Sequence, residues 1–154
     1  MKTISTHADA AKRIKAELKQ SFPMIKFSVK SKSYSGGDSI DIGWTNGPAA
    51  CSVNKIVKKY EYGKFDGMTD CYDYTNVRND IPQTKYVFAS RDISDDIFDE
   101  AFIKFKKRYM SLADLPSLNY DCKEFLKKTG FWNARQYIFS IISTRDLTNG
   151  LGEI

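Results

Sequence analysis

The sequence has one histidine, three cysteines and no long apolar run. His7 lies in a polar N-terminal stretch, and a catalytic dyad or triad would depend on this single imidazole, so we expect no catalysis through it. Cys51, Cys71 and Cys122 are odd in number and widely spaced, which fits neither a disulfide framework nor a zinc site and indicates a reducing compartment. No segment approaches the roughly 18 apolar residues of a membrane span, and no secretory signal is present. We therefore expect a cytoplasmic protein of a host cell, without membrane contact, metal ion or cofactor.

Charge is unevenly distributed along the 154 residues, although the net value is only +5. Residues 1–35 hold eight basic and two acidic side chains, a net charge of +6, whereas residues 61–100 hold ten acidic and four basic side chains, a net charge of −6. A basic surface attracts phosphate backbones or acidic proteins, and an acidic surface attracts basic grooves. The length, with 42% hydrophobic and 28% charged residues, is that of one globular domain, so we expect a single domain over residues 1–154.

The N-terminal third predicts a helix followed by a β-hairpin. Apolar residues recur at helical spacing between a cap at Ser5 or Thr6 and a stop at Pro23. That apolar stripe consists of Ala8, Ala11, Ile14 and Leu18. Apolar and basic residues then alternate over 25–30, as in a strand with one buried side. A second strand is predicted with Ile40, Ile42 and Trp44 inward and Asp41 outward. A phosphate-binding loop places its glycines between a strand and a helix, so we interpret Gly36 and Gly37 as the hairpin turn.

The rest of the chain predicts further helices and short strands. An apolar stripe indicates a second helix, with Val53, Ile56, Val57 and Tyr60 on its buried side. Short strands are expected around 72–74 and over 85–90, and a long helix begins after Ser94 and runs to about Tyr109. Residues 121–128 predict a short helix closed by Gly130. Residues 131–144 predict another helix, although 137–142 also fits a buried strand. The expected fold class is α+β, with C-terminal helical elements packed on a small antiparallel sheet.

Three segments of the sequence carry a family resemblance. Phe27–Ser31, Tyr34–Pro48 (YSGGDSIDIGWTNGP) and Lys64–Met68 resemble the large polyvalent protein associated domains, number 29 in that series. The resemblance covers residues 11–93, and 94–154 form a mainly helical part without a counterpart. It implies a protein of phages or conjugative elements, a class associated with entry into a host and with countering host defence. It implies no catalytic residues.

The first candidate binding surface is basic. Lys12, Lys15 and Lys19 share one side of the first helix, and three hairpin lysines share the side of the strand that faces away from the core. If helix and strand pack by their apolar sides, the two lysine rows lie on different layers and meet around one edge. These lysines could neutralise phosphates, with Tyr34 as a stacking surface, or could form an ordinary solvated face. The hairpin residues of this candidate are Lys26, Lys30, Lys32 and Tyr34.

The second candidate surface is acidic and aromatic, and consists of Asp66, Asp70, Tyr72 and Asp73. Three carboxylates in one loop could hold Mg²⁺ for a nuclease, but their spacing matches no ligand loop, and solvated loop acids are the simpler interpretation. Such a patch could also occupy a basic groove that is meant for DNA or RNA, with tyrosine as an interface anchor.

These observations together predict a non-enzymatic binding protein of a phage or conjugative element. Its expected role is to interfere with a host defence complex of the CRISPR or restriction type by occluding a binding surface. The partner would be a host defence protein or ribonucleoprotein. The alternative is a nucleic-acid-binding accessory protein that contacts the phosphates of DNA or RNA through the basic face of the hairpin.

Overall fold

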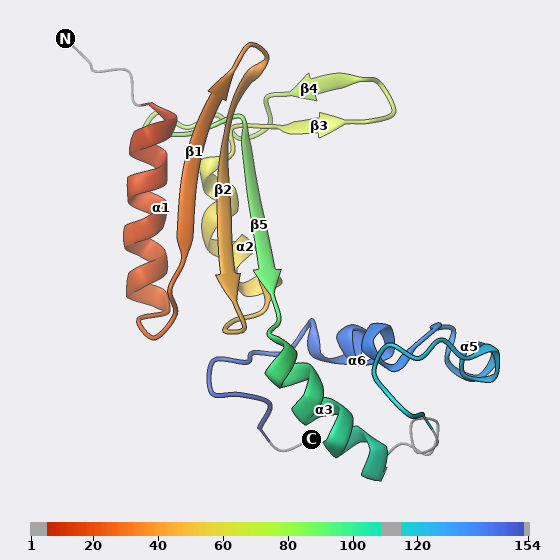
Figure 1. Ribbon diagram of the computed structural model, residues 1–154. Helices are drawn as coiled ribbons and strands as arrows, with labels where there is room; N and C mark the ends of the chain where they lie inside the picture. Colours follow the sequence, from red (N-terminus) through yellow and green to blue (C-terminus); the bar gives the residue numbers. More distant parts are fainter. Residues whose placement is uncertain (1–5, 109–114, 153–154) are drawn as a thin grey trace. The chain divides into compact units, whose positions relative to one another are not determined.

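The computed structural model describes residues 6–108 and 115–152, and its fold class is α+β, as predicted (Figure 1). Contacts between Cα atoms divide the chain into two compact units. The first, here called the sheet unit, comprises the chain up to Trp44 together with Ala50–Arg91. The second, the helical unit, comprises Thr45–Ala49 and the chain from Asp92 onward. The single domain expected from the length stays a prediction.

The sheet unit is built on a three-stranded sheet with the strand order β1-β2-β5. Strands β1 and β2 form the predicted antiparallel hairpin, in which Ser28 lies opposite Gly43 and Tyr34 opposite Gly37. Strand β5 runs parallel to β2 on its other side, so the sheet is mixed (Figure 1). The bounds are α1 (His7–Ser21), β1 (Ser28–Tyr34), β2 (Gly37–Thr45), α2 (Ala50–Val57), the 3-10 helix η1 (Lys58–Tyr60) and β5 (Tyr86–Asp92).

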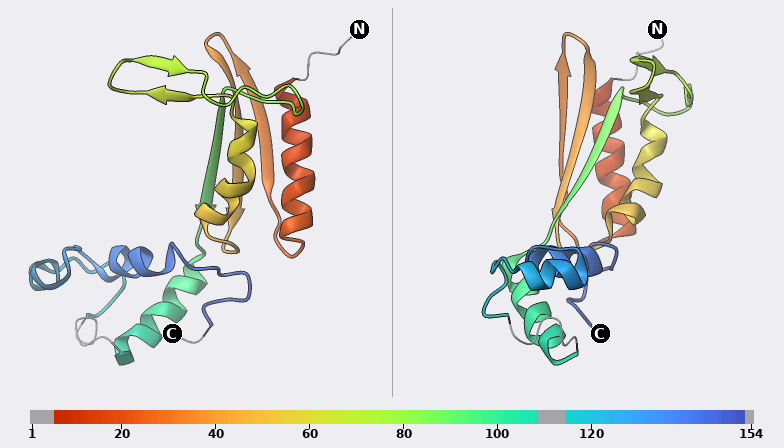
Figure 2. Two further views of the ribbon diagram at one scale, coloured as in Figure 1. Left: turned by 180° about the vertical axis from the view of Figure 1, so that it is seen from behind. Right: turned by 90° about the vertical axis from the view of Figure 1, so that its right-hand side faces the viewer.

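Helices α1 and α2 lie against the same face of this sheet (Figure 2). Their apolar sides and the inward side chains of β2 form one core, and the predicted inward residues Ile40, Ile42 and Trp44 are all buried. On α1 the fully buried alanine is Ala10, because a four-residue spacing aligns it with Ile14 and Leu18. The alanines expected from the sequence, Ala8 and Ala11, are only partly buried.

The turn of the first hairpin depends on glycine at one position. Gly37 has a φ of +147°, in the range that L side chains rarely adopt. A Cβ at this position would also lie 2.6 Å from Cδ of Lys85. The interpretation of the two glycines as a turn between strands is therefore confirmed.

A second hairpin, β3 (Lys64–Asp66) with β4 (Cys71–Asp73), belongs to the same unit. The strand expected around 72–74 corresponds to β4, whereas β3 was not predicted. The hairpin extends beyond the β1-β2-β5 sheet (Figure 1). At its base, the Tyr72 hydroxyl donates a 2.6 Å hydrogen bond to the carbonyl of Lys85, which joins β4 to the chain entering β5.

The helical unit contains α3 (Asp95–Arg108), α5 (Lys123–Thr129) and α6 (Ala134–Ile142) around a core that includes Phe105, Ile138 and Ile142. Residues 134–142 are helical, so the helical alternative for this run is the correct one. Gly130 has a φ of +80° and ends α5, as predicted. The expected end of the long helix at Tyr109 lies outside the described residues. No helix within the described ranges is long and apolar enough to cross a bilayer.

Candidate functional site

The face of the sheet opposite α1 and α2 is the main candidate surface, and we call it the open face. Side chains alternate between the two faces of each strand, so the inward position of Ile40, Ile42 and Val87 places their neighbours on the open face. The antiparallel register gives the facing pairs on β1 and β2. The open face carries Ser28, Lys30, Lys32 and Tyr34 of β1, Gly37, Ser39, Asp41 and Gly43 of β2, and Tyr86, Phe88 and Ser90 of β5.

Lysines line the β1 side of the open face. Lys26, Lys30 and Lys32 are all exposed and recur at alternate positions, as the sequence predicted. Lys32 donates to Asp41 across the hairpin at 2.6 Å, which neutralises one of the three charges. Lys26 and Lys30 form no hydrogen bond or ion pair with any residue that the structure describes. The β1 side of the face therefore keeps unpaired positive charge.

Aromatic rings occupy the rest of the open face. The rings of Tyr86 and Phe88 are nearly parallel, with centroids 5.9 Å apart and an interplanar angle of 16°. Phe88 is 54% exposed and Tyr34 is 48% exposed. Burial, and then the neighbouring Tyr86, raise the pKa of Tyr34 above its usual value. Together with the small residues Gly37 and Gly43, these rings form a surface on which flat groups can stack.

Tyr86 and Phe88 were not among the residues predicted from the sequence. Residues 85–90 were recognised as a strand, but the chain leaves about 40 residues between β2 and β5, so nothing local indicates that they pair. The alternation Tyr86, Val87, Phe88 was the available signal. It separates one apolar position toward the core from two aromatic positions on the opposite side.

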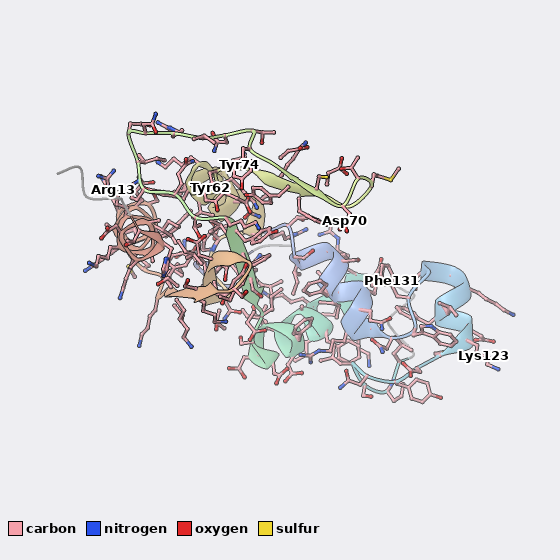
Figure 3. All side chains as sticks on the ribbon, turned by 90° about the horizontal axis from the view of Figure 1, so that it is seen from above. Arg13, Tyr62, Asp70, Tyr74, Lys123 and Phe131 are labelled. Atoms are coloured by element: carbon pink, nitrogen blue, oxygen red, sulfur yellow. The ribbon has the colours of Figure 1, made fainter. Side chains whose placement is uncertain are left out.

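A cluster of tyrosines continues from the open face to the base of the second hairpin. The rings of Tyr62 and Tyr74 stack at 5.6 Å and 6°, and Tyr72 contacts both of them and Tyr86 edge to face. Burial raises the pKa of Tyr72, and the nearby Glu61 adds to this rise. Figure 3 shows Tyr62 and Tyr74 together at the base of this hairpin. Tyr72 is half-buried and hydrogen-bonded, so its role within the described structure is to hold the hairpin in place.

Lys85 is a further residue that the sequence did not single out. Its Nζ lies 5.1 Å from the centroid of the Tyr72 ring and 5.6 Å from that of Tyr86. It also donates to the carbonyl of Gly36 at 2.8 Å. This ammonium group therefore joins the tyrosine cluster to the turn of the first hairpin.

The three predicted carboxylates lie along the second hairpin and do not converge. Asp66 accepts the backbone N–H of Met68 at 2.9 Å, Asp70 occupies a left-handed position with a φ of +54°, and Asp73 lies opposite Lys64. Figure 3 places Asp70 near the turn of this hairpin. Among residues 6–108 and 115–152 no three histidine, cysteine, aspartate or glutamate side chains are grouped as metal ligands. The hairpin is instead an acidic strip with two exposed apolar side chains, Phe65 and Met68.

Comparison with known proteins identifies a family for more than half of the chain. The family model described as large polyvalent protein associated domain 29 matches residues 5–96. This range contains the whole open face and the second hairpin. No curated protein and no solved structure matches the chain.

Proposed function

The chain belongs to the family of large polyvalent protein associated domain 29, and this family is associated with phages and mobile genetic elements. We propose that the chain is a non-enzymatic binding protein of such an element. We propose further that its open face binds single-stranded nucleic acid. The observation that carries this proposal is the juxtaposition of exposed rings and lysines on one sheet face. The exposed rings are Tyr34 and Phe88, with the half-buried Tyr86 stacked against Phe88, and the unpaired lysines are Lys26 and Lys30.

Rings and lysines supply the two kinds of contact that a single strand requires. Unpaired bases stack on aromatic side chains irrespective of sequence, at about 1–3 kcal/mol per base. Lysines beside them neutralise the phosphates that follow each base, which makes binding weaken as salt rises. A duplex hides the faces of its bases, so exposed rings on an open sheet favour a single strand.

A matched pair of phenylalanines tests the proposal. Phe88 and Phe65 are almost equally exposed, at 54% and 52%, but only Phe88 lies on the open face. We expect Phe88→Ala to weaken binding of an internally labelled oligothymidylate roughly 5- to 150-fold, the equivalent of about 1–3 kcal/mol. Phe65→Ala should leave the affinity unchanged. Fluorescence anisotropy measures both, and equal affinities of the two variants would contradict the proposal.

Salt dependence provides a second measurement on the same complex. Each phosphate neutralised on a single strand contributes a slope of roughly −0.7 to the plot of log K against log salt concentration. Contacts from the two unpaired lysines, Lys26 and Lys30, therefore predict a slope of about −1.4. Reversing the charge of Lys30 should make the slope shallower by about 0.7, and a slope near zero in the wild type would remove the phosphate contacts from the proposal.

The non-enzymatic part of the proposal has its own test. The carboxylates Asp66, Asp70 and Asp73 are spread along the hairpin, so we expect plasmid DNA to stay intact when incubated with the protein and Mg²⁺ or Mn²⁺. Cleavage that disappears in Asp66→Asn or Asp70→Asn would overturn it.

The second hairpin supports a second candidate function, interference with a host defence complex. Met68 is 95% exposed and lies next to Asp66 on a hairpin that extends beyond the sheet (Figure 1). Exposed apolar side chains among carboxylates suit a partner protein whose apolar pocket has a basic rim, as in a site that receives nucleic acid. By occupying that rim, the hairpin would keep the partner's own ligand from its site.

Two glycines of this hairpin give a matched test of that candidate. A Cβ at Gly63 would overlap the backbone carbonyl oxygen of Asp73, whereas a Cβ at Gly67 meets no atom within 4 Å. Gly63→Ala should therefore displace the hairpin and abolish capture of a defence nuclease or ribonucleoprotein in pull-downs from infected cells. Gly67→Ala should retain that capture. Capture of no such complex by the wild type, or equal capture by both variants, would contradict this function.

A further inference from the structure

A basic cavity lies in the sheet unit where α1 ends and the chain turns into β1. Its volume is about 290 Å³, and it is lined by Lys15 and Lys19 of α1 and by Pro23–Phe27. This size is just below the roughly 300–1,000 Å³ of typical small-molecule sites. We propose that this cavity binds a nucleoside phosphate, with the lysines holding the phosphate and the apolar wall holding the base.

Positive charge at the cavity comes from two separate elements and is not neutralised. Lys15 and Lys19 are one helical turn apart on α1, and Lys26 approaches from the segment before β1. None of the three forms a hydrogen bond or ion pair with a described residue, and none of the described residues that line the cavity is acidic. Elsewhere in the same unit, by contrast, Lys32 and Lys59 are paired with carboxylates. Three unpaired lysines on the lining of one hollow favour the binding of an anion, and phosphate is a strong acceptor for their ammonium groups.

The remaining wall of the cavity is apolar and favours a phosphate that carries a flat apolar group such as a base. Ile25 and Phe27 contribute apolar surface. The Phe27 ring contacts two other rings, with centroid distances of 6.0 Å to Phe22 and 5.5 Å to Trp44. Met24 is almost fully exposed, and its flexible thioether can adapt to a flat ligand. Bare phosphate would use the lysines alone, whereas a nucleotide uses both the charge and the apolar wall.

The cavity also continues the lysine row of the open face. Lys26 is the first of the alternating lysines that continue with Lys30 and Lys32 on β1, and it lines the cavity as well. The nucleoside phosphate can thus come from two sources, a free nucleotide or the terminal nucleotide of a strand lying on the open face. The second source rests on the proposed function, whereas the first does not.

The test titrates the full-length protein with adenosine monophosphate, adenosine and inorganic phosphate by calorimetry. The monophosphate should bind more tightly than either fragment, and Lys15→Glu/Lys19→Glu should weaken it about tenfold or more. Lys55→Glu/Lys64→Glu reverses the same number of charges at two exposed lysines outside the cavity, and this control should bind as the wild type does. Amide NMR shifts of residues 25–27 should follow the titration.

The outcomes separate this proposal from the proposed function. Absence of monophosphate binding at millimolar concentration, or binding that the double charge reversal leaves unchanged, overturns the cavity site. Inorganic phosphate binding as tightly as the monophosphate overturns the role of the apolar wall. Phe88→Ala should leave monophosphate binding intact while it weakens the oligonucleotide. Oligonucleotides with and without a terminal phosphate separate the two sources. If the terminal phosphate raises the affinity, and Lys15→Glu/Lys19→Glu removes this gain, the strand end is a source of the ligand. If the two oligonucleotides bind with equal affinity, only the free nucleotide remains as the source.

Discussion

The two faces of the β1-β2-β5 sheet come from the same three strands, yet their side chains differ in kind. The face under α1 and α2 carries Ile40, Ile42 and Val87, which are between 0% and 2% exposed. The open face carries lysines, tyrosines and Phe88, which contact solvent. Alternation along each strand makes this possible, since successive residues point to opposite sides. Substitutions of side chains on the covered face should therefore change the free energy of unfolding, and substitutions of the exposed lysines and rings on the open face should change ligand affinity.

The largest effect is expected on the covered face. Ile42→Ala removes a buried side chain between the sheet and its helices, and should lower the free energy of unfolding by about 2–5 kcal/mol, because a cavity is left in a packed core. Lys30→Ala on the open face should change it by no more than about 0.5 kcal/mol. Urea denaturation measures both. Similar losses in the two variants would mean that the faces are not separated in this way.

Two glycines of β2, both on the open face, sharpen the comparison. Gly37 has a φ of +147° and its added Cβ would lie 2.6 Å from Cδ of Lys85, whereas at Gly43 an added Cβ meets no atom within 4 Å. Gly37→Ala should cost about 1–3 kcal/mol, through backbone strain and displacement of Lys85. Gly43→Ala should be neutral or stabilising by up to about 1 kcal/mol, because it reduces the freedom of the unfolded chain. Thermal denaturation of both variants decides this, and a neutral Gly37→Ala would show that the turn tolerates a side chain.

The first hairpin was predictable because its determinants are local. Alternation of apolar and polar residues gave the inward positions Ile40, Ile42 and Trp44, and two adjacent glycines gave the turn. The lysine row 26, 30 and 32 followed from the same alternation. Strand β3 was missed because three residues are too few for an alternating pattern to indicate a strand, and these residues are held by pairing with β4.

Long-range arrangement was the part that the sequence did not contain. The stacking of Tyr86 on Phe88 follows from the strand itself, but their position beside β1 and β2 depends on a connection through α2 and the second hairpin. The sequence placed the helix and strand lysines in two rows that could meet at an edge. Only the fold shows that Lys15, Lys19 and Lys26 line one cavity there.

A polar contact lies at the border of the covered face. Removing it would show whether α1 and the covered face are held together by apolar packing alone. The buried Tyr60 donates its hydroxyl to Glu17 of α1 at 2.8 Å, and Lys59 donates to the same carboxylate. Burial and the bond to Glu17 raise the pKa of Tyr60 to about 12. Burial alone would raise the pKa of Glu17, but the bonds from Lys59 and Tyr60 outweigh it and lower that pKa.

Removing this hydroxyl should have a moderate effect. Tyr60→Phe should lower the free energy of unfolding by about 1 kcal/mol, the usual contribution of one hydrogen bond. Between pH 10 and about 12 the folded state keeps the Tyr60 proton that the unfolded state loses, so stability falls with rising pH, and this fall should be shallower in Tyr60→Phe. Tyr74→Phe, which removes an exposed hydroxyl, should change stability at neutral pH by less than about 0.5 kcal/mol. An unchanged stability and an unchanged alkaline slope in Tyr60→Phe would refute the role of this contact.

The smallest expected effect is a gain in oligonucleotide affinity. It measures the contribution of charge on the open face separately from that of stacking. Asp41 pairs with Lys32 at 2.6 Å and is the acidic side chain that faces the lysine row from β2. Asp41→Asn keeps the shape of the side chain, frees Lys32 for a phosphate and removes a repulsive charge. Because exposed ion pairs are worth about 0.2–1 kcal/mol, the pair itself costs little to lose, and the oligothymidylate affinity should rise by about two- to fivefold at low salt. Glu100→Gln, which breaks a comparable exposed pair with Lys104 in the helical unit, should leave the affinity unchanged. If Asp41→Asn weakens binding, the pair serves to position Lys32, and the gain expected from free charge on this face is wrong.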